Sequence, residues 1–434
     1  MSRTVSTERT PRASNGIWLL LLALVTGIGA YALVGLGRRG HVPPRIELYG
    51  SLIAAGFIGA WLVVRRFARR ADPVLLPAAA LLSALGFAVI WRLEPDLAVE
   101  QVTWVGVGLV AFVMTLVLVR DDRMLDAYTY TIGLAGLVML LLPVVPGIGR
   151  EINGARLWVE IGPLHFQPAE FGKILIVMFL ASYLSDKREM LAAGSGRFAL
   201  PRVKDLGPLL IAWATSLAVL FLEKDLGASL LYFAVFVVML WIASGRPLFL
   251  LVGLVLFVAG AWVGYLALNH VQLRVDVWLH AFDPEKVYGQ GYFQLAQGQF
   301  ALASGGLVGT GLGQGSPGLI TYAHSDFIFA AIGEELGLLG TASILMVYLS
   351  LIGRSLRVGV ERTDAFGKLL ATGLITIVAV QTFVIVGGVT RLIPLTGITL
   401  PFVSYGGSSL VANFVILALL IRVSAGPWAP RVKA

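Results

Sequence analysis

A short polar segment, AFDPEKVYGQGYFQ at residues 281–294, places the carboxylate of Asp283 among tyrosines, glutamines and glycines. Because Asp283 precedes Pro284, helical backbone is disfavoured there and the segment is predicted to be a loop. A loop carboxylate could act as a general base, and the neighbouring donors and acceptors suit sugar hydroxyls. Asp-Pro is also a common turn pair, so a purely structural role stays open. His280 and Asp283 could together hold a cation, although two ligands do not define a metal site.

A second polar segment, NGARLWVEIGPLHFQPAEFGK at residues 153–173, places Glu170 and Lys173 three residues apart. Pro168 suits the first turn of a helix, and the spacing puts both charges on one helix face. They could form an ion pair that anchors a helix end at a membrane surface. Alternatively, they line a polar cavity that opens outward, with Arg156 nearby to meet an anion.

Acidic residues also interrupt or border apolar runs. Asp225 lies in EKDLGAS, where it could be a turn and helix-start residue or a polar site residue. Asp326 and Glu335 lie in HSDFIFAAIGEELG, within or beside an apolar run. Acidic groups are rare at such positions and usually line a cavity or pair with a cation.

A further segment, TRLIPLTGITLPFVSYGGSSL at residues 390–410, combines two prolines, several glycines and several hydroxyls. Irregular backbone at membrane depth is tolerated only where it is buried in protein or faces water. The length and composition favour a lining segment over a tight connecting loop. We expect Arg391 to be the cation at its mouth.

The composition is that of an integral membrane protein. The 434 residues are 57% hydrophobic and 13% charged, and the apolar residues come in long runs. The net charge is +8, but the basic residues form short clusters between those runs, which indicates topology signals and not a nucleic-acid surface. The chain has no cysteine, which excludes disulfides, thiolate metal sites and a cysteine nucleophile.

The apolar runs predict an all-α polytopic protein, because each span of roughly 17–25 apolar residues crosses a bilayer as a helix. About twelve spans are predicted, near 17–37, 47–64, 74–92, 102–119, 128–146, 170–186, 207–222, 228–243, 247–268, 326–352, 369–388 and 408–423.

A cytoplasmic N-terminus and C-terminus put most basic clusters on the inner side, which follows the positive-inside rule. Only the basic segment GRRGHVPPR at 37–45 then falls on the outside. Three long polar segments, residues 147–169, 269–325 and 389–407, lie on the outer face, the second as a large loop between the ninth and tenth helices. We expect the chemistry there.

Five segments taken together resemble the SEDS family (shape, elongation, division and sporulation): FQPAEFGK, KDLGAS, FDPEKVYGQGYFQ, HSDFIFAAIGEELG and LIPLTGITLPFVSYGGSSL. Their order and spacing match from about Ala71 onward. The resemblance implies a ten-helix core over residues 71–424, which includes the loop 269–325. Residues 17–70 are then an additional N-terminal helical hairpin, and residues 1–16 and 425–434 are cytoplasmic tails.

The resemblance implies a peptidoglycan glycosyltransferase that polymerises lipid II into β-1,4 glycan strands at the outer face of the cytoplasmic membrane, of the elongation type more than the division type. The family's essential acid matches Asp283. The spacing departs from the family pattern, because Lys286, Val287 and Tyr288 intervene before Gly-Tyr, so Asp276 in RVDVW is a second candidate. The expected substrate-binding residues are Arg156, Gln167, Glu170, Lys173, Asp225, Gln294, Asp326, Glu335, Arg391, Ser404 and Ser408.

The expected partners are lipid II, the undecaprenyl-diphosphate-linked glycan and a class B penicillin-binding protein, which is a transpeptidase. No cofactor is required by the sequence, although a divalent cation could assist. The alternative function is a lipid II flippase or another transporter, which would place coupled charges near the bilayer midplane. The polar residues here gather toward the outer face, which favours the enzyme.

Overall fold

The computed structural model describes residues 16–152, 155–161, 164–188, 214–215, 217–219, 221–289 and 291–426. Within these residues, ten helices are long and apolar enough to cross a membrane. They are α1 (Gly16–Arg39), α2 (Ile46–Phe67), α3 (Leu75–Leu93), α4 (Ala98–Leu118), α7 (Pro168–Asp186), α10 (Leu226–Ser244), α11 (Leu248–Ala267), α14 (Ile328–Glu361), α15 (Ala365–Val389) and α16 (Gly407–Ala425). The predicted all-α membrane fold is confirmed.

Two predicted spans differ from these helices. The span near 128–146 is a shorter apolar helix, α6 (Thr129–Leu141), which continues as the 3-10 turn η3 (Leu142–Val144). The span near 207–222 lies mostly outside the described residues. The short helix α5 (Arg123–Asp126) and the 3-10 turns η2 (Pro95–Leu97) and η4 (Pro317–Leu319) lie between the spans.

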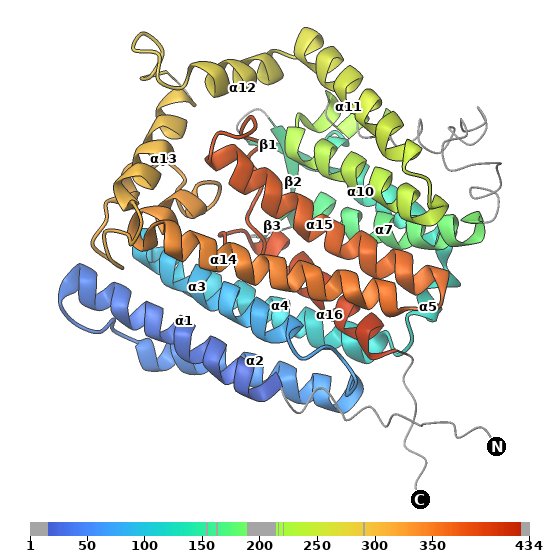
Figure 1. Cartoon of the computed structure of the whole chain (residues 1–434), viewed down its shortest axis with the longest axis horizontal. Coiled ribbons are helices and arrows are strands. Elements are labelled where there is room, and N and C mark those ends of the chain that lie inside the picture. Colours follow the sequence, from blue (N-terminus) through green and yellow to red (C-terminus); the bar gives the residue numbers. More distant parts are fainter. Residues whose placement is uncertain are drawn as a thin grey trace, which may run out of the picture.

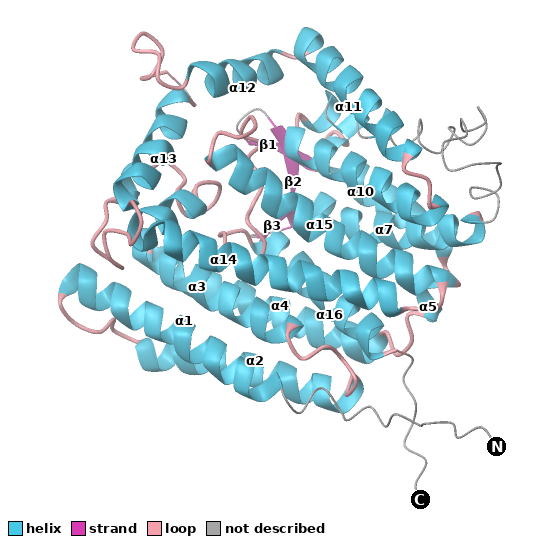
Figure 2. Ribbon diagram, viewed as in Figure 1, coloured by secondary structure: helices cyan, strands magenta, loops and turns pink. Residues whose placement is uncertain are grey.

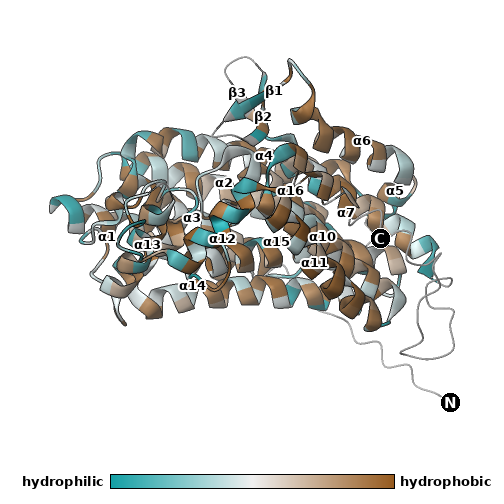
Figure 3. Cartoon of the chain, turned by 90° about the horizontal axis from the view of Figure 1, so that it is seen from above, coloured by the Kyte–Doolittle hydropathy of each residue, from teal (hydrophilic) through white to brown (hydrophobic). Residues whose placement is uncertain are grey.

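The helices run side by side, with α3, α15 and α16 mostly buried and α11 mostly exposed (Figure 1). The exposed side chains of α11 are apolar, and Leu251, Leu254 and Val258 are examples. The ribbons of the spanning helices carry mostly hydrophobic residues, drawn brown in Figure 3. An apolar exterior is what a helix bundle presents to lipid, because lipid cannot hydrogen-bond to polar groups.

About half of the predicted large loop at 269–325 is helical. Helix α12 (Asn269–His280) crosses one end of the bundle, and α13 (Tyr292–Gly305) returns from it toward α14 (Figure 1). Among the described residues of this segment, irregular backbone occupies 281–289 and 291 and the stretch from Gly306 to Phe327 apart from η4. Two helices in place of an open loop fix the position of the residues that they carry.

A small antiparallel sheet with the order β1-β2-β3 was not predicted. Its strands are β1 (Gly149–Ile152), β2 (Ala155–Ile161) and β3 (Leu164–Phe166), and they project beside α6 (Figures 2 and 3). Val159 pairs with Gly149 on one side and with Phe166 on the other. The sheet lies between spans, so the all-α expectation holds for the spans but not for this connecting segment.

Helix α14 is broken at Gly337, whose φ of 66° and ψ of −167° are not helical. The loop formed by residues 305–316 enters the break. The backbone N–H of Thr310 donates to the carbonyl of Glu334 at 2.9 Å, and that of Leu338 donates to the carbonyl of Gly306 at 2.9 Å. The loop therefore supplies hydrogen bonds that the helix loses at the break, as backbone within a membrane protein requires.

Replacing Gly337 by alanine should lower the thermal stability of the detergent-solubilised protein. The left-handed φ costs a non-glycine residue about 1–3 kcal/mol, and an added Cβ would lie 2.3 Å from the N atom of Gly309. The matched control is Gly353→Ala on the same helix, where an added Cβ meets nothing within 4 Å. Equal melting temperatures for the two variants would contradict this account of the break.

Candidate active site

The three polar segments predicted to lie on one face do contact one another. The backbone N–H of Gln167, which precedes α7, donates to Ser408 Oγ at 3.1 Å. Ser404 Oγ donates to the carbonyl of Ser325 at 2.7 Å and accepts the backbone N–H of Leu400 at 2.9 Å. Ser404 and Ser408 therefore hold the segment 389–407 against the segments before α7 and α14.

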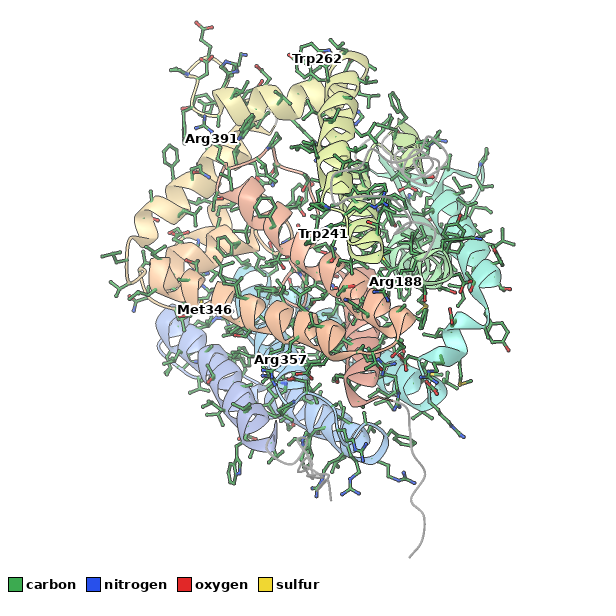
Figure 4. The ribbon with its side chains drawn as sticks, turned by 45° about the vertical axis from the view of Figure 1, so that its right-hand side comes forward. Arg188, Trp241, Trp262, Met346, Arg357 and Arg391 are labelled. Atoms are coloured by element: carbon green, nitrogen blue, oxygen red, sulfur yellow. The ribbon has the colours of Figure 1, made fainter. Side chains whose placement is uncertain are left out.

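Arg391 fastens α12 to the end of α15. Its Nε donates to the carbonyl of Trp278 at 2.8 Å and its Nη2 to that of Leu279 at 3.1 Å, while Trp278 Nε1 donates back to the carbonyl of Arg391 at 3.0 Å. A cation at the C-terminal carbonyls of a helix also offsets the helix dipole. The guanidinium lies 5.2 Å from the ring centre of Phe282, below the loop that joins α12 and α13 (Figure 4).

Asp283 lies in that loop, as the sequence predicts. Its Oδ1 accepts the backbone N–H of Glu285 at 3.1 Å, and its carbonyl accepts the N–H of Val287 at 2.8 Å. The side chain is half-buried. From the described residues, Oδ2 receives no hydrogen bond. One carboxylate oxygen thus shapes the turn and the other is open to a proton donor.

Asp276, the second candidate, is fully engaged. It accepts Lys286 Nζ at 2.9 Å and pairs with His280 Nδ1 at 2.8 Å, and the hydroxyl of Tyr292 donates to it. The hydrogen bond from Tyr292, followed by that from Lys286, lowers the pKa of Asp276 to about 2. A base with so low a pKa takes up a proton poorly near neutral pH. His280 therefore pairs with Asp276. Among the described residues its side chain makes no contact with Asp283 that would support a cation site between the two.

The predicted pair of Glu170 and Lys173 forms an ion pair of 2.5 Å near the start of α7. Lys173 is only 3% exposed, and its Nζ also lies 3.3 Å from Gln381 Oε1 on α15. A buried ammonium is costly unless it is paired and hydrogen-bonded, and both conditions are met here. Asp225 accepts the backbone N–H of Ala228 at 2.8 Å and so caps α10, as its turn chemistry suggested.

Arg274 on α12 is a site residue that sequence reasoning missed. Its Nη1 donates to the carbonyl of Leu395 at 2.9 Å. Burial lowers the pKa of Arg274, and the negative charges of Asp225 and Asp326 oppose that shift. Gly397, with a φ of 75°, lies against this group, because an added Cβ would be 3.6 Å from Asp326 Oδ2 and 3.7 Å from Arg274 Nη2.

Three other predicted site residues form hydrogen bonds or ion pairs with other parts of the protein. Arg156 is on β2, where its half-exposed side chain pairs with Glu151 at 3.3 Å. Gln294 Nε2 donates to the carbonyl of Thr321 at 2.7 Å. Glu335 Oε1 accepts Arg92 Nε at 2.9 Å, in a network with the loop 305–316. These contacts give each residue a structural role, and their expected contacts with substrate stay predictions.

The chemistry available at this end of the bundle is proton transfer beside cations. Asp283 offers a carboxylate oxygen that receives no hydrogen bond from the described residues. Lys173 pairs with Glu170 near the start of α7, and Arg274 on α12 donates to the carbonyl of Leu395. Among the described residues, no group of three or more histidine, aspartate or glutamate side chains is placed to hold a metal ion. A base together with fixed cations suits a displacement in which an anionic group departs.

Comparison with known proteins gives consistent matches. The sequence model of the family FtsW/RodA/SpoVE, described as "Cell cycle protein", matches residues 75–426. The chain is 44% identical to the peptidoglycan glycosyltransferase RodA of Mycobacterium tuberculosis over 96% of this chain and 92% of that protein. It is 35% identical to the probable peptidoglycan glycosyltransferase FtsW of Geobacter metallireducens over 70% of this chain and 79% of that protein.

Two solved structures are also similar. A chain described under "Structural coordination of polymerization and crosslinking by a peptidoglycan synthase complex" matches with a TM-score of 0.66 and 29% identity, covering 82% of this chain and 97% of that one. The crystal structure of the rod shape determining protein RodA of Thermus thermophilus matches with a TM-score of 0.57 and 28% identity, covering 83% of this chain and 98% of that one.

Proposed function

Because the chain belongs to the SEDS family, which includes FtsW, RodA and SpoVE, we propose that Asp283 is the general base with which it builds glycan strands from lipid II. The chain is a membrane-embedded peptidoglycan glycosyltransferase, as its relatives are named. The observation that supports Asp283 most directly is its open Oδ2. The other candidate, Asp276, is held by Lys286, His280 and Tyr292.

In the proposed step, Asp283 takes the proton from the 4-hydroxyl of the lipid II N-acetylglucosamine. That oxygen attacks the anomeric carbon of the lipid-linked N-acetylmuramic acid at the end of the growing strand. The new C–O bond forms as the bond to the undecaprenyl diphosphate breaks, and the diphosphate leaves with the electron pair. Attack from the opposite face inverts the α-linked diphosphate to a β-1,4 linkage.

Cations that lie near the departing diphosphate would stabilise the charge that develops on it. Lys173 and Arg274 are the best placed, because Glu170 holds Lys173 near the start of α7 and the carbonyl of Leu395 holds Arg274 on α12. Arg391 and Arg156 were expected to share this task. Arg391 donates its hydrogen bonds to backbone carbonyls of α12, and Arg156 forms an ion pair with Glu151 on the sheet. We therefore assign the diphosphate to Lys173 and Arg274.

The transporter alternative gains little support from the broken helix α14. Breaks in transporter helices commonly leave backbone groups free to bind an ion or substrate. Here the carbonyls of Glu334 and Glu335 already accept hydrogen bonds from the backbone N–H groups of Thr310 and Gly311. These carbonyls at the break are therefore not free to bind an ion or a substrate, and the break gives no support for a transport site.

Replacing Asp283 by asparagine should abolish polymerisation while the protein still folds and binds lipid II. Asparagine keeps the size of the side chain but cannot accept the proton, and losing a general base costs about 10²–10⁴-fold in turnover. Purified protein and lipid II, followed by separation of glycan polymers, measure the rate. Asp276→Asn is the matched control. An inactive Asp276 variant beside an active Asp283 variant would transfer the role of base to Asp276.

The polymerase is expected to work with a class B penicillin-binding protein. A similar structure comes from a complex that joins polymerisation with crosslinking, and no Ser-x-x-Lys nucleophile motif lies in an outer segment of this chain. Such a partner should co-purify with the chain and raise its rate of lipid II polymerisation. Equal rates with and without every such transpeptidase would remove the activation from the proposal.

The site is expected to face the outside of the cytoplasmic membrane, with both termini in the cytoplasm. Gln290 lies outside the described residues, but Tyr288, two positions earlier in the same loop, is 86% exposed. Because the chain has no cysteine, Tyr288→Cys should react with an impermeant maleimide in spheroplasts. Arg357→Cys at the opposite end of the bundle is the control and should react only after lysis (Figure 4). The reverse result would invert the topology.

A further inference from the structure

Helices α1 and α2 form a hairpin that precedes the part of the chain matched by the family, which begins at residue 75. The hairpin lies along α3 and α4 (Figure 1). Its fit against α3 is close, because a Cβ added at Gly27 would lie 2.3 Å from the Cβ of Ala84. The ring of Tyr31 meets those of Phe87 and Trp91 edge-on, with centroids 5.1 and 5.0 Å away. The hairpin is therefore packed onto the core as a fixed element.

The end of α1 also touches the loop 305–316. A Cβ added at Gly37 would lie 2.0 Å from the carbonyl oxygen of Leu312. In return, a Cβ added at Gly313 would lie 2.4 Å from the carbonyl oxygen of Val34 and 2.8 Å from the N atom of Arg38. Two glycines thus let the backbones of α1 and the loop approach closely. No larger residue at Gly37 fits this arrangement without moving the loop.

An arginine pair holds the same loop from the side of α3. Arg38 Nη1 donates to the carbonyl of Arg92 at 2.9 Å. Arg92 donates to Gly315 O at 2.6 Å and to Glu335 Oε1 at 2.9 Å, and Glu335 Oε2 accepts the N–H of Gly313 at 2.8 Å. Arg38 belongs to the basic segment 37–45 that departs from the positive-inside pattern. Its hydrogen bond to the carbonyl of Arg92 gives this arginine a structural role.

The braced loop leads to the candidate active site through α14. The loop enters the break at Gly337, so it holds the short outer part of α14 that begins at Ile328. Asp326 lies just before that part. A Cβ added at Gly397 would lie 3.6 Å from Asp326 Oδ2 and 3.7 Å from Arg274 Nη2, so both side chains lie close to Gly397. The C-terminal end of α12 carries the turn of Asp283. A continuous series of contacts therefore connects the hairpin with the catalytic loop.

We propose that the α1–α2 hairpin is a positioning element for glycan polymerisation. It braces the loop 305–316, which holds the outer part of α14 and keeps Asp326 against Arg274. Gly37 and Arg38 are its positioning residues, and neither touches the reacting atoms. The inference rests on the proposed function of the site, and it assigns to the hairpin a role beyond anchoring the chain in the membrane.

The test compares two valine substitutions on α1 in the full-length protein. Gly37→Val should push the carbonyl of Leu312 away and loosen the loop. Gly29→Val is the matched control on the same helix, since an added Cβ at Gly29 meets nothing within 4 Å. Arg38→Met is a milder second variant that removes only the contact with Arg92, and it decides the question should Gly37→Val fail to fold.

Two measurements are made on each variant, lipid II polymerisation and hydrogen–deuterium exchange in residues 305–316. Gly37→Val should lower kcat about tenfold or more with little change in KM, because misplacing positioned groups by about 1 Å costs up to about 100-fold. Exchange in the loop should rise in parallel, and Arg38→Met should give smaller changes in the same direction. The Gly29 variant should match the parent in both measurements.

Parent-like polymerisation and parent-like exchange in Gly37→Val and Arg38→Met would overturn the proposal and leave the hairpin as an anchor. Faster exchange with an unchanged kcat would also overturn it, because the loop would then be braced without effect on the reaction. Failure of the proposed function itself looks different, since the parent protein would then form no polymer while the exchange comparison would still report on the brace.

Discussion

Backbone hydrogen bonding inside a bilayer is the constraint on which this architecture depends. A helix that breaks at membrane depth must find other partners for its N–H and C=O groups. At Gly337 those partners come from the loop 305–316, so a polar segment between α13 and α14 becomes part of the helix that follows it. The part of α14 before the break begins just after Asp326, whose Oδ2 lies close to Gly397, as does Arg274 Nη2.

One end of the bundle is organised around α12, which lies across the helix ends and is held by arginines. Arg274 ties one part of α12 to the segment 389–407, and Arg391 ties the C-terminal end to α15. Arginine suits both positions because its planar group donates several hydrogen bonds in fixed directions. The turn of Asp283 follows directly from this fixed end. Its position is therefore set by contacts between segments that are distant in the sequence.

Local chemistry in the sequence predicted a good part of this arrangement. The spacing of Glu170 and Lys173 predicted their shared helix face, and the Asp-Pro pair predicted the turn at Asp283. The apolar runs predicted nearly all of the described spans and the gathering of three polar segments at one end. These features depend on periodicity and turn residues, which neighbouring residues determine.

Features that depend on distant partners were not predicted. Nothing near Arg274 in the sequence indicates that Asp225, Asp326 and Leu395 surround it. Gly337 resembles the many other glycines of membrane helices, and only the arrival of the loop makes its backbone special. For the sheet a signal did exist, since Asn-Gly at 153–154 stands between two short runs with strand residues, a pattern typical of a hairpin.

The contact between Gly37 and Leu312 has a consequence for biogenesis. The two residues are separated by roughly 275 positions, and synthesis at about 5–20 residues per second delivers the second some 14–55 s after the first. During that interval α1 can pack on α3, but Gly37 cannot yet make its contact with Leu312. The hairpin is therefore inserted into the membrane first, and its contact with the loop 305–316 forms later, after that loop has been synthesised.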